Sequence, residues 1–220
     1  MPTTVQDQGE VLATTRNNTG TASSTNQELN TQGAMLAAFS LPLNSEVVRL
    51  GNSYVGGSTT AVAPVSAMPT TAAQLALWNG EATGGKSYVI HRIGFTGAVS
   101  AGAAIIQQLL VHVRTVASTV ITGTAALGPK SLSGRVSTSA ATVLSGVTLG
   151  ANDGLWHPAG SSVNAGAATA TVGLGTDFDC NGLYVIPPGG TFSLAVLCSA
   201  AGTQTNQLFV TWSEVNIALG

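Results

Sequence analysis

The chain has 220 residues, of which 7 are Lys or Arg and 9 are Asp or Glu, so its formal net charge is −2 and only 7% of its residues are charged. An ordinary soluble domain carries roughly 25% charged residues. So few, scattered cations exclude a nucleic-acid binder that works by neutralising phosphates, and the 44% of hydrophobic residues excludes a disordered polar chain.

Residues 1–45 differ in composition from the rest of the chain. Thr, Asn, Gln, Ser and Gly dominate from Pro2 to Gly33, and the first aromatic residue is Phe39. Such a segment cannot bury enough apolar surface to fold alone. We therefore expect an extended N-terminal arm over 1–45, ordered by neighbouring subunits, and a folded domain over 46–220. An arm that wraps its own domain is the alternative.

Neither a targeting segment nor a membrane span is expected. The first residues, Met1–Asp7, have neither the basic stretch nor the apolar stretch of a secretion signal. No run approaches the roughly 18 apolar residues of a membrane-spanning helix.

The remainder of the chain is predicted to form β-strands. Apolar runs rich in β-branched and aromatic residues alternate with connectors of Gly, Ser and Thr, and no convincing helical pattern of ten residues follows residue 45. The runs are 74–78, 87–95, 105–116, 183–186, 191–197 and 207–215. Eight or so strands without intervening helices predict an all-β fold, an antiparallel β-sandwich of jelly-roll type. Long connectors around 117–150 and 159–171 favour sandwich loops over tight hairpins.

Side-chain alternation predicts which faces of two strands are buried. In 105–116, one face is apolar and is expected to be core: Leu109, Val111 and Val113. The opposite face mixes polar and apolar groups and is expected to tolerate water or a partner: Ile106, Leu110 and Val116 with Gln108, His112 and Arg114. In the last strand the expected core residues are Leu208, Val210 and Trp212, and Trp78 and Trp156 are also expected in the core.

Gly80–Ser87 matches the nucleotide-binding pattern G-x-x-x-x-G-K-S/T. That mechanism needs a helix beginning at the lysine, because the helix N-terminus supplies aligned amides to the phosphates. The residues after Lys86 instead favour a strand. We therefore interpret 79–86 as a β-hairpin loop and expect Lys86→Ala to leave any function intact. A P-loop NTPase remains a remote alternative that rests on this pattern alone.

No catalytic, cofactor-binding or metal-binding residues are predicted, and the chain is not expected to be an enzyme. His91, His112 and His157 could form a metal site with Asp153 or Asp179, but their spacing is unlike that of a helical histidine pair. Each histidine is expected on its own strand, bonded to a neighbouring hydroxyl or carbonyl. The G-x-S-x-G elbow of many serine hydrolases is absent from the sequence, and a Ser–His–Asp triad built from distant strands has no positive support.

Asp177 and Asp179 lie two residues apart, so on a strand they share a face. Paired carboxylates can hydrolyse glycosidic bonds when they line a cleft. The preferred interpretation is a solvated sheet edge or a calcium-tolerant loop, just before a strand end at Cys180–Gly182.

Two cysteines, Cys180 and Cys198, are nearly symmetric about the turn at 187–190. A cross-strand disulfide is possible if the flanking segments pair directly as a hairpin. Sandwich connections often cross between sheets, so buried thiols are the other outcome, and the more frequent one.

The composition also predicts a surface made of Thr, Ser, Asn, Gln, Gly and Ala. Short side chains lose little entropy when they are buried, and burying them strands no unpaired charge. Such a surface suits contacts between copies, so we expect a homo-oligomer with closed symmetry, taken as a trimer.

Three stretches, 84–90, 186–194 and 209–215, resemble those of tailed-phage virion proteins, whereas the arm shows no such similarity. In that family a jelly-roll subunit decorates or cements the capsid, commonly as a trimer, with an extended arm that reaches neighbours. The resemblance therefore implies a non-enzymatic structural subunit in the virion, whose partners are its own copies and other capsid proteins, with no nucleic acid, membrane or cofactor. The alternative is an extracellular adhesin or carbohydrate-binding β-sandwich, which predicts an exposed aromatic platform and a calcium site near Asp177 and Asp179.

Overall fold

A computed structural model of the chain describes residues 45–99, 105–114, 121–134, 138–149, 155–164, 175–199 and 204–217. The chain divides into two units, Met1–Glu46 and Val47–Gly220. Residues 1–44 of the predicted N-terminal arm lie outside the described residues, so the arm stays a prediction.

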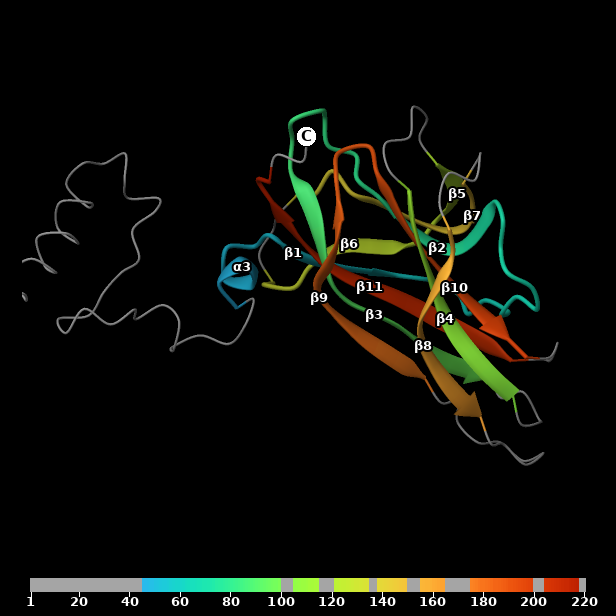
Figure 1. Cartoon of the computed structure of the whole chain (residues 1–220). Coiled ribbons are helices and arrows are strands. Elements are labelled where there is room, and N and C mark those ends of the chain that lie inside the picture. The colour runs from blue at the N-terminus through green and yellow to red at the C-terminus, as the bar shows by residue number, and fades with distance from the viewer. Residues whose placement is uncertain are drawn as a thin grey trace, which may run out of the picture. The chain divides into compact units, whose positions relative to one another are not determined.

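The described residues form one short helix, α3 (Ser45–Arg49), and eleven strands (Figure 1). The first four strands are β1 (Ser53–Gly57), β2 (Ala72–Trp78), β3 (Ser87–Val99) and β4 (Ile105–Arg114). The next four are β5 (Thr122–Ala125), β6 (Leu127–Ser131), β7 (Thr142–Thr148) and β8 (His157–Asn164). The last three are β9 (Thr176–Ile186), β10 (Thr191–Cys198) and β11 (Thr205–Val215).

These strands make two antiparallel sheets that pack against each other. Sheet I has the order β6-β1-β11-β3-β9, and sheet II has the order β5-β7-β2-β10-β4-β8. The predicted all-β antiparallel sandwich is therefore confirmed. Within the described residues, no helix has the length and apolar character needed to cross a membrane.

The main hydrophobic core lies between the two sheets. Both predicted core faces contribute to it, because Leu109 and Val111 of β4 and Trp212 of β11 are completely buried there. The ring of Trp212 stacks on Tyr54 with a centroid distance of 5.8 Å. Each large apolar side chain buried in this way contributes roughly 1.5–3 kcal/mol, so alternation along a few strands accounts for much of the sandwich's stability.

A second, smaller cluster covers the outer face of sheet II. Leu110 alternates with the core-facing residues of β4, yet it is fully buried in a cluster with Leu149 and Trp156. His112, on the same face, is also fully buried, and its ring lies 5.2 Å from that of Trp156. The prediction that this face tolerates water is therefore wrong at Leu110 and His112, because residues from the later part of the chain pack on it.

The prediction of long connectors around 117–150 and 159–171 was also partly wrong. They contain β5, β6, β7 and most of β8. β5 is exposed at every position, and its sequence is Thr-Gly-Thr-Ala, so it carries no apolar alternation. It is held as a strand by its antiparallel pairing with β7, which is a tertiary contact that local sequence does not encode.

Candidate functional site

The Gly80–Ser87 segment connects the two sheets. It runs from β2 in sheet II to β3 in sheet I, and β3 begins at Ser87. The predicted strand after Lys86 is confirmed, so the helix that a phosphate-binding loop requires does not follow it. The prediction of a β-hairpin is wrong, because β2 and β3 lie in different sheets and do not pair with each other.

Lys86 of this segment is bound to a carboxylate inside the protein. Its Nζ lies 3.1 Å from Oε2 of Glu214, whose side chain is fully buried, and the hydroxyl of Ser139 donates to Oε1 of the same carboxylate. Burial lowers the pKa of Lys86, but the hydrogen bond and charge of Glu214 outweigh it, and the net pKa is raised. Burial, followed by the charge of Glu214, raises the pKa of Tyr88 well above its ordinary value. These contacts give Lys86 a structural role.

Asn79 joins the same segment to the turn between β9 and β10. Its Nδ2 donates to the carbonyls of Lys86 (2.9 Å) and Ile186 (3.0 Å), and its Oδ1 accepts from the backbone of Glu81 (3.1 Å). Its backbone exchanges two further bonds with the turn, to Gly189 and Gly190. Asn79 is fully buried, so these five bonds satisfy a polar group that would be unfavourable to bury alone.

A serine and a histidine are hydrogen-bonded on sheet I. His91 Nε2 lies 2.7 Å from Oγ of Ser213. Burial lowers the pKa of His91, and the charge of Asp179 opposes this shift. The three residues have the composition of a hydrolytic triad, but Ser213 is only 2% exposed, and Asp179 accepts from the backbone of Asn181 (3.1 Å). We interpret His91 as the hydrogen-bond partner of the buried Ser213. This agrees with the prediction that each histidine bonds to a neighbouring hydroxyl or carbonyl.

The other two histidines lie on different strands. His112 is buried on β4, and His157, at the start of β8, shares a hydrogen bond of 2.9 Å with the hydroxyl of Tyr184. Within the described part of the chain, no group of three or more His, Cys, Asp or Glu side chains could hold a metal ion. Asp153, a candidate ligand in the sequence, lies outside the described residues.

The two cysteines are in different sheets. Cys180 belongs to β9 and Cys198 to β10; both are buried, and they are not joined by a disulfide. β9 pairs with β3, whereas β10 pairs with β2 and β4, so the hairpin that a cross-strand bridge would require does not form. Burial, with a smaller contribution from the charge of Asp179, raises the pKa of the Cys180 thiol to about 12.

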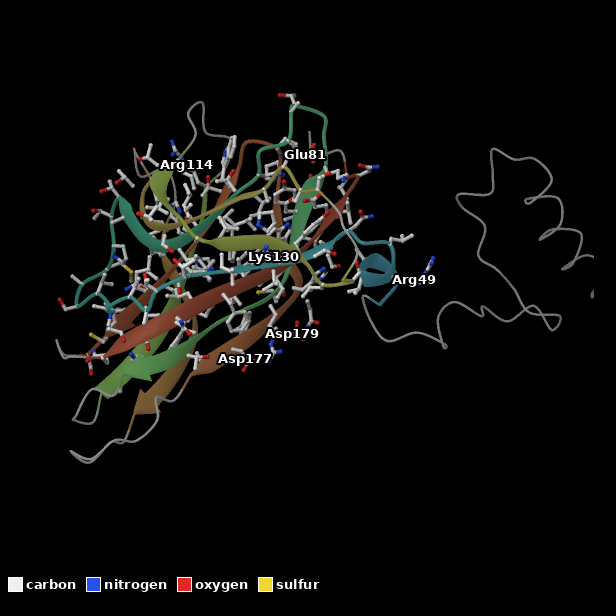
Figure 2. All side chains as sticks on the ribbon, turned by 180° about the vertical axis from the view of Figure 1, so that it is seen from behind. Arg49, Glu81, Arg114, Lys130, Asp177 and Asp179 are labelled. Atoms are coloured by element: carbon white, nitrogen blue, oxygen red, sulfur yellow. The ribbon has the colours of Figure 1, made fainter. Side chains whose placement is uncertain are left out.

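Asp177 and Asp179 are exposed on β9, which is an edge strand of sheet I. The interpretation as a solvated sheet edge is therefore confirmed. The predicted strand end at Cys180–Gly182 is instead a bulge within β9, where Asn181 and Gly182 have positive φ. Figure 2 shows Asp177 and Asp179 as neighbours on this strand, whereas the other charged residues labelled there lie on separate elements.

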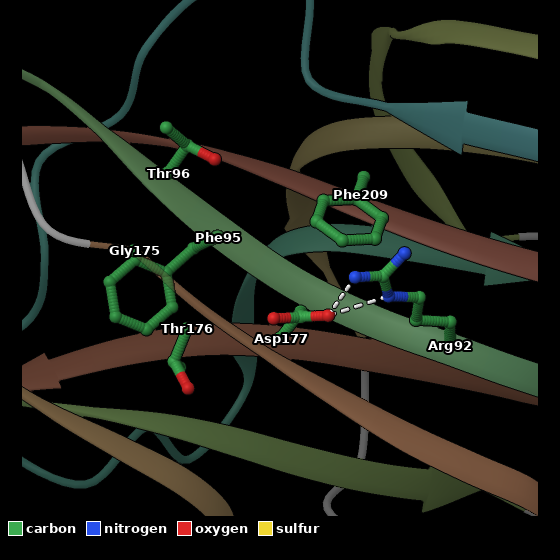
Figure 3. Close-up of a pocket in the computed structure, with 7 residues that line it drawn as sticks. All are labelled: Arg92, Phe95, Thr96, Gly175, Thr176, Asp177 and Phe209. Atoms are coloured by element: carbon green, nitrogen blue, oxygen red, sulfur yellow. Dashed lines mark hydrogen bonds and ion pairs between the residues drawn. The ribbon is translucent and has the colours of Figure 1, made fainter.

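Asp177 helps to form a pocket on sheet I. Nε of Arg92 donates to Oδ2 of Asp177 at 2.6 Å, and Nη2 donates to the same oxygen. The pocket has a volume of about 220 Å³. It is lined by Arg92, Phe95, Thr96, Gly175, Thr176, Asp177 and Phe209 (Figure 3).

A glycine next to the pocket lets the ring of Phe209 lie close against the sheet. Gly57, Phe209, Gly94 and Asp177 form one row of register partners across β1, β11, β3 and β9. A Cβ at Gly94 would lie 2.7 Å from the ring of Phe209 and 2.7 Å from the carbonyl oxygen of Thr176. The ring of Phe209 thus occupies the space that a side chain at 94 would take.

Sequence reasoning did not identify this pocket. The sequence indicates Asp177 only as one of two neighbouring acids, and it does not point to Arg92, Phe209 or Gly94 as site residues. Arg92 and Asp177 are 85 positions apart, so only the pairing of β3 with β9 brings them together. The available signal was a glycine inside a strand, which often marks a close approach of other groups.

No protein-family model, curated protein or solved structure matches this chain.

Proposed function

We propose that this chain is a non-enzymatic structural subunit of a viral particle of the tailed-phage type. In this proposal the sandwich is a jelly roll that associates with copies of itself and with other capsid proteins in the virion. The proposal rests chiefly on the order in which the strands pair.

Eight of the eleven described strands pair from the two ends of the domain inward. β1 pairs with β11, β2 with β10, β3 with β9 and β4 with β8. Successive pairs alternate between sheets I and II. This is the pairing expected when a long antiparallel hairpin is rolled into two sheets, as in the eight-stranded jelly rolls of many capsid proteins. The three added strands, β5–β7, fall between β4 and β8 in sequence and extend the sheets beside β2 and β1.

Fold alone is a weak basis for function, and the surface supplies separate support. Nine charged side chains are described, and four of them form the pairs Lys86–Glu214 and Arg92–Asp177. Large apolar side chains are exposed on the same domain, among them Leu155 (87%), Leu183 (68%) and Leu127 (52%). Exposed apolar groups on a surface with little charge favour burial against another protein.

The edges of the sheets offer a way to form such contacts. Leu183 lies in the edge strand β9, and Leu155 lies two residues before the edge strand β8. Edge strands present unpaired backbone groups that can bind another chain. In the proposed assembly, these edges and the arm 1–45 contact neighbouring copies, and three copies close a ring.

The test is the mass of the full-length chain in solution, measured by light scattering or native mass spectrometry over a range of concentrations. We expect a stable oligomer of three copies. Removing residues 1–40 should leave domains that are folded by circular dichroism but dissociated. A full-length chain that stays monomeric at the highest concentrations would contradict the proposal. Location is tested separately, by asking with labelled antibody and negative-stain microscopy whether the chain is part of native particles.

A further inference from the structure

The pocket beside Phe209 has a chemical character that assembly does not require. Three groups on its rim lie on different strands: the Arg92 guanidinium on β3, the Asp177 carboxylate on β9 and the Phe209 ring on β11 (Figure 3). Thr96 is a fourth, an exposed residue next to the core residue Phe95 on β3. The pocket thus combines the aromatic ring of Phe209 with hydrogen-bond donors and acceptors.

The charges of the pocket cancel. Arg92 uses Nε and Nη2 to bind Oδ2 of Asp177. These two bonds leave Oδ1 of Asp177 as an acceptor and Nη1 of Arg92 as a donor for a ligand. Both side chains are about half exposed, at 57% and 49%, so a ligand can reach them. The pair therefore offers an acceptor at one end and a donor at the other, with no net charge (Figure 3).

The neutral Arg92–Asp177 pair favours a polar, uncharged ligand over charged and apolar ones. An anion would have to compete with Asp177 for the guanidinium, and a cation would be repelled by Arg92. An apolar ligand would leave the polar groups without partners, which is unfavourable. A ligand that carries hydroxyl groups at several positions around a ring can bond to Nη1, Oδ1 and the Thr96 hydroxyl, because each hydroxyl both donates and accepts. The C–H face of such a ligand can pack on the ring of Phe209.

Size narrows the class further. A volume of about 220 Å³ is below the roughly 300–1,000 Å³ of pockets for drug-sized ligands, and it suits a single six-membered ring. We propose that this pocket binds one neutral hexopyranose unit of a glycan. The proposal rests on the lining of this pocket and not on the assembly proposed above, although Asp177 lies on the edge strand β9 that the assembly also uses.

The experiment is saturation-transfer difference NMR on the full chain with the methyl glycosides of glucose, galactose, mannose and N-acetylglucosamine. At least one of them should receive saturation, with a Kd on the order of millimolar, as expected for a small open pocket. Asp177→Asn and Phe209→Leu should each weaken the binding by about tenfold, the effect of one lost hydrogen bond or ring contact. Asp179→Asn is the matched control, because it neutralises a carboxylate on the same strand that does not line the pocket.

Three outcomes would overturn the proposal. They are the absence of saturation in all four sugars, binding that is unchanged in both pocket variants, and displacement of the sugar by inorganic phosphate, which would indicate an anion site. Thr96→Val provides a further variant at an exposed position in case Phe209→Leu does not fold, with folding checked by circular dichroism. Assembly is measured by mass alone, so a failure of sugar binding would leave the structural proposal standing.

Discussion

The ammonium group of Lys86 lies 3.1 Å from the carboxylate of Glu214, so the lysine of a P-loop-like pattern neutralises a buried acid of its own domain. The two residues are 128 positions apart, and they connect the start of β3 with the end of β11. The ion pair therefore stabilises the fold at the site where the sequence pattern alone indicated a phosphate.

Replacing Lys86 should destabilise the domain. Lys86→Met leaves the buried carboxylate of Glu214 uncompensated, which costs several kcal/mol at a fully buried site. Because the Lys86 side chain is 36% exposed, we expect solvent screening to reduce the loss to about 1–3 kcal/mol. Urea unfolding measures this loss, with Lys130→Met, at an exposed position of β6, as the matched control. Adding Glu214→Gln should recover part of the loss, because the amide oxygen still accepts from Ser139; equal stability of Lys86→Met and the control would refute this role.

Alkaline pH should weaken the domain partly through Cys180. Burial raises the pKa of this thiol from 9.0 to about 12, so between these values the folded state holds a proton that the unfolded state has lost. Stability therefore falls as pH rises from 9 towards 12, by at most about 1.4 kcal/mol per pH unit for one proton. The raised pKa values of Tyr88 and Lys86 act in the same direction at higher pH. Cys180→Ala should show a shallower decline between pH 9 and 11 in urea unfolding, and a slope equal to that of the unchanged chain would contradict the assignment.

A methyl group at position 94 should be poorly tolerated. In Gly94→Ala the Cβ would meet the ring of Phe209 and a backbone carbonyl, each at 2.7 Å. The ring can move, but the carbonyl belongs to the β3–β9 ladder, so we expect a loss of roughly 1–3 kcal/mol. Gly160→Ala on β8 is the control, since its nearest neighbour atoms lie at 3.8 Å. In thermal unfolding, the midpoint temperature of Gly160→Ala should lie close to that of the unchanged chain. Equal shifts for the two substitutions would show that packing does not require glycine at position 94.

The side-chain amide of Asn79 should be required for the stability of the domain. Asn79→Asp keeps the acceptor for the backbone of Glu81 but replaces the donor to Lys86 and Ile186 with an oxygen that faces two carbonyls. A buried polar group without its partner costs about 1–3 kcal/mol, and more when it is charged. Asn216→Asp, at an exposed position, is the matched control. Comparable midpoints of denaturation for the two variants would show that the contacts of Asn79 contribute little.

Alternation of apolar residues predicted the fold class and the inner core. Leu109, Val111 and Trp212 were assigned to buried faces from period-two patterns alone, and all three are fully buried. The same pattern could not place Leu110 and His112, because their burial depends on tertiary packing with Leu149 and Trp156, which are distant in sequence.

Pairing between distant strands was the part that local sequence did not predict. β5 became a strand through its partner β7, although no residue in Thr122–Ala125 favours burial. The same limit applies to the pocket, since Arg92 and Asp177 meet only through the β3–β9 register. Phe209 was predicted to lie in a strand, but its role depends on the absence of a side chain at Gly94 across the ladder.

The pairing of β1 with β11 has a consequence for how the chain reaches its native state. Ser53 and Ser213 are register partners although 160 positions separate them. Such non-local contacts must wait for the closure of a very long loop, and proteins dominated by them fold slowly. During translation, β1 has to remain without this partner until the residues of β11 have been synthesised and have emerged from the ribosome. Nascent chains should therefore depend on chaperones and aggregate readily, and lower growth temperature should raise the soluble yield.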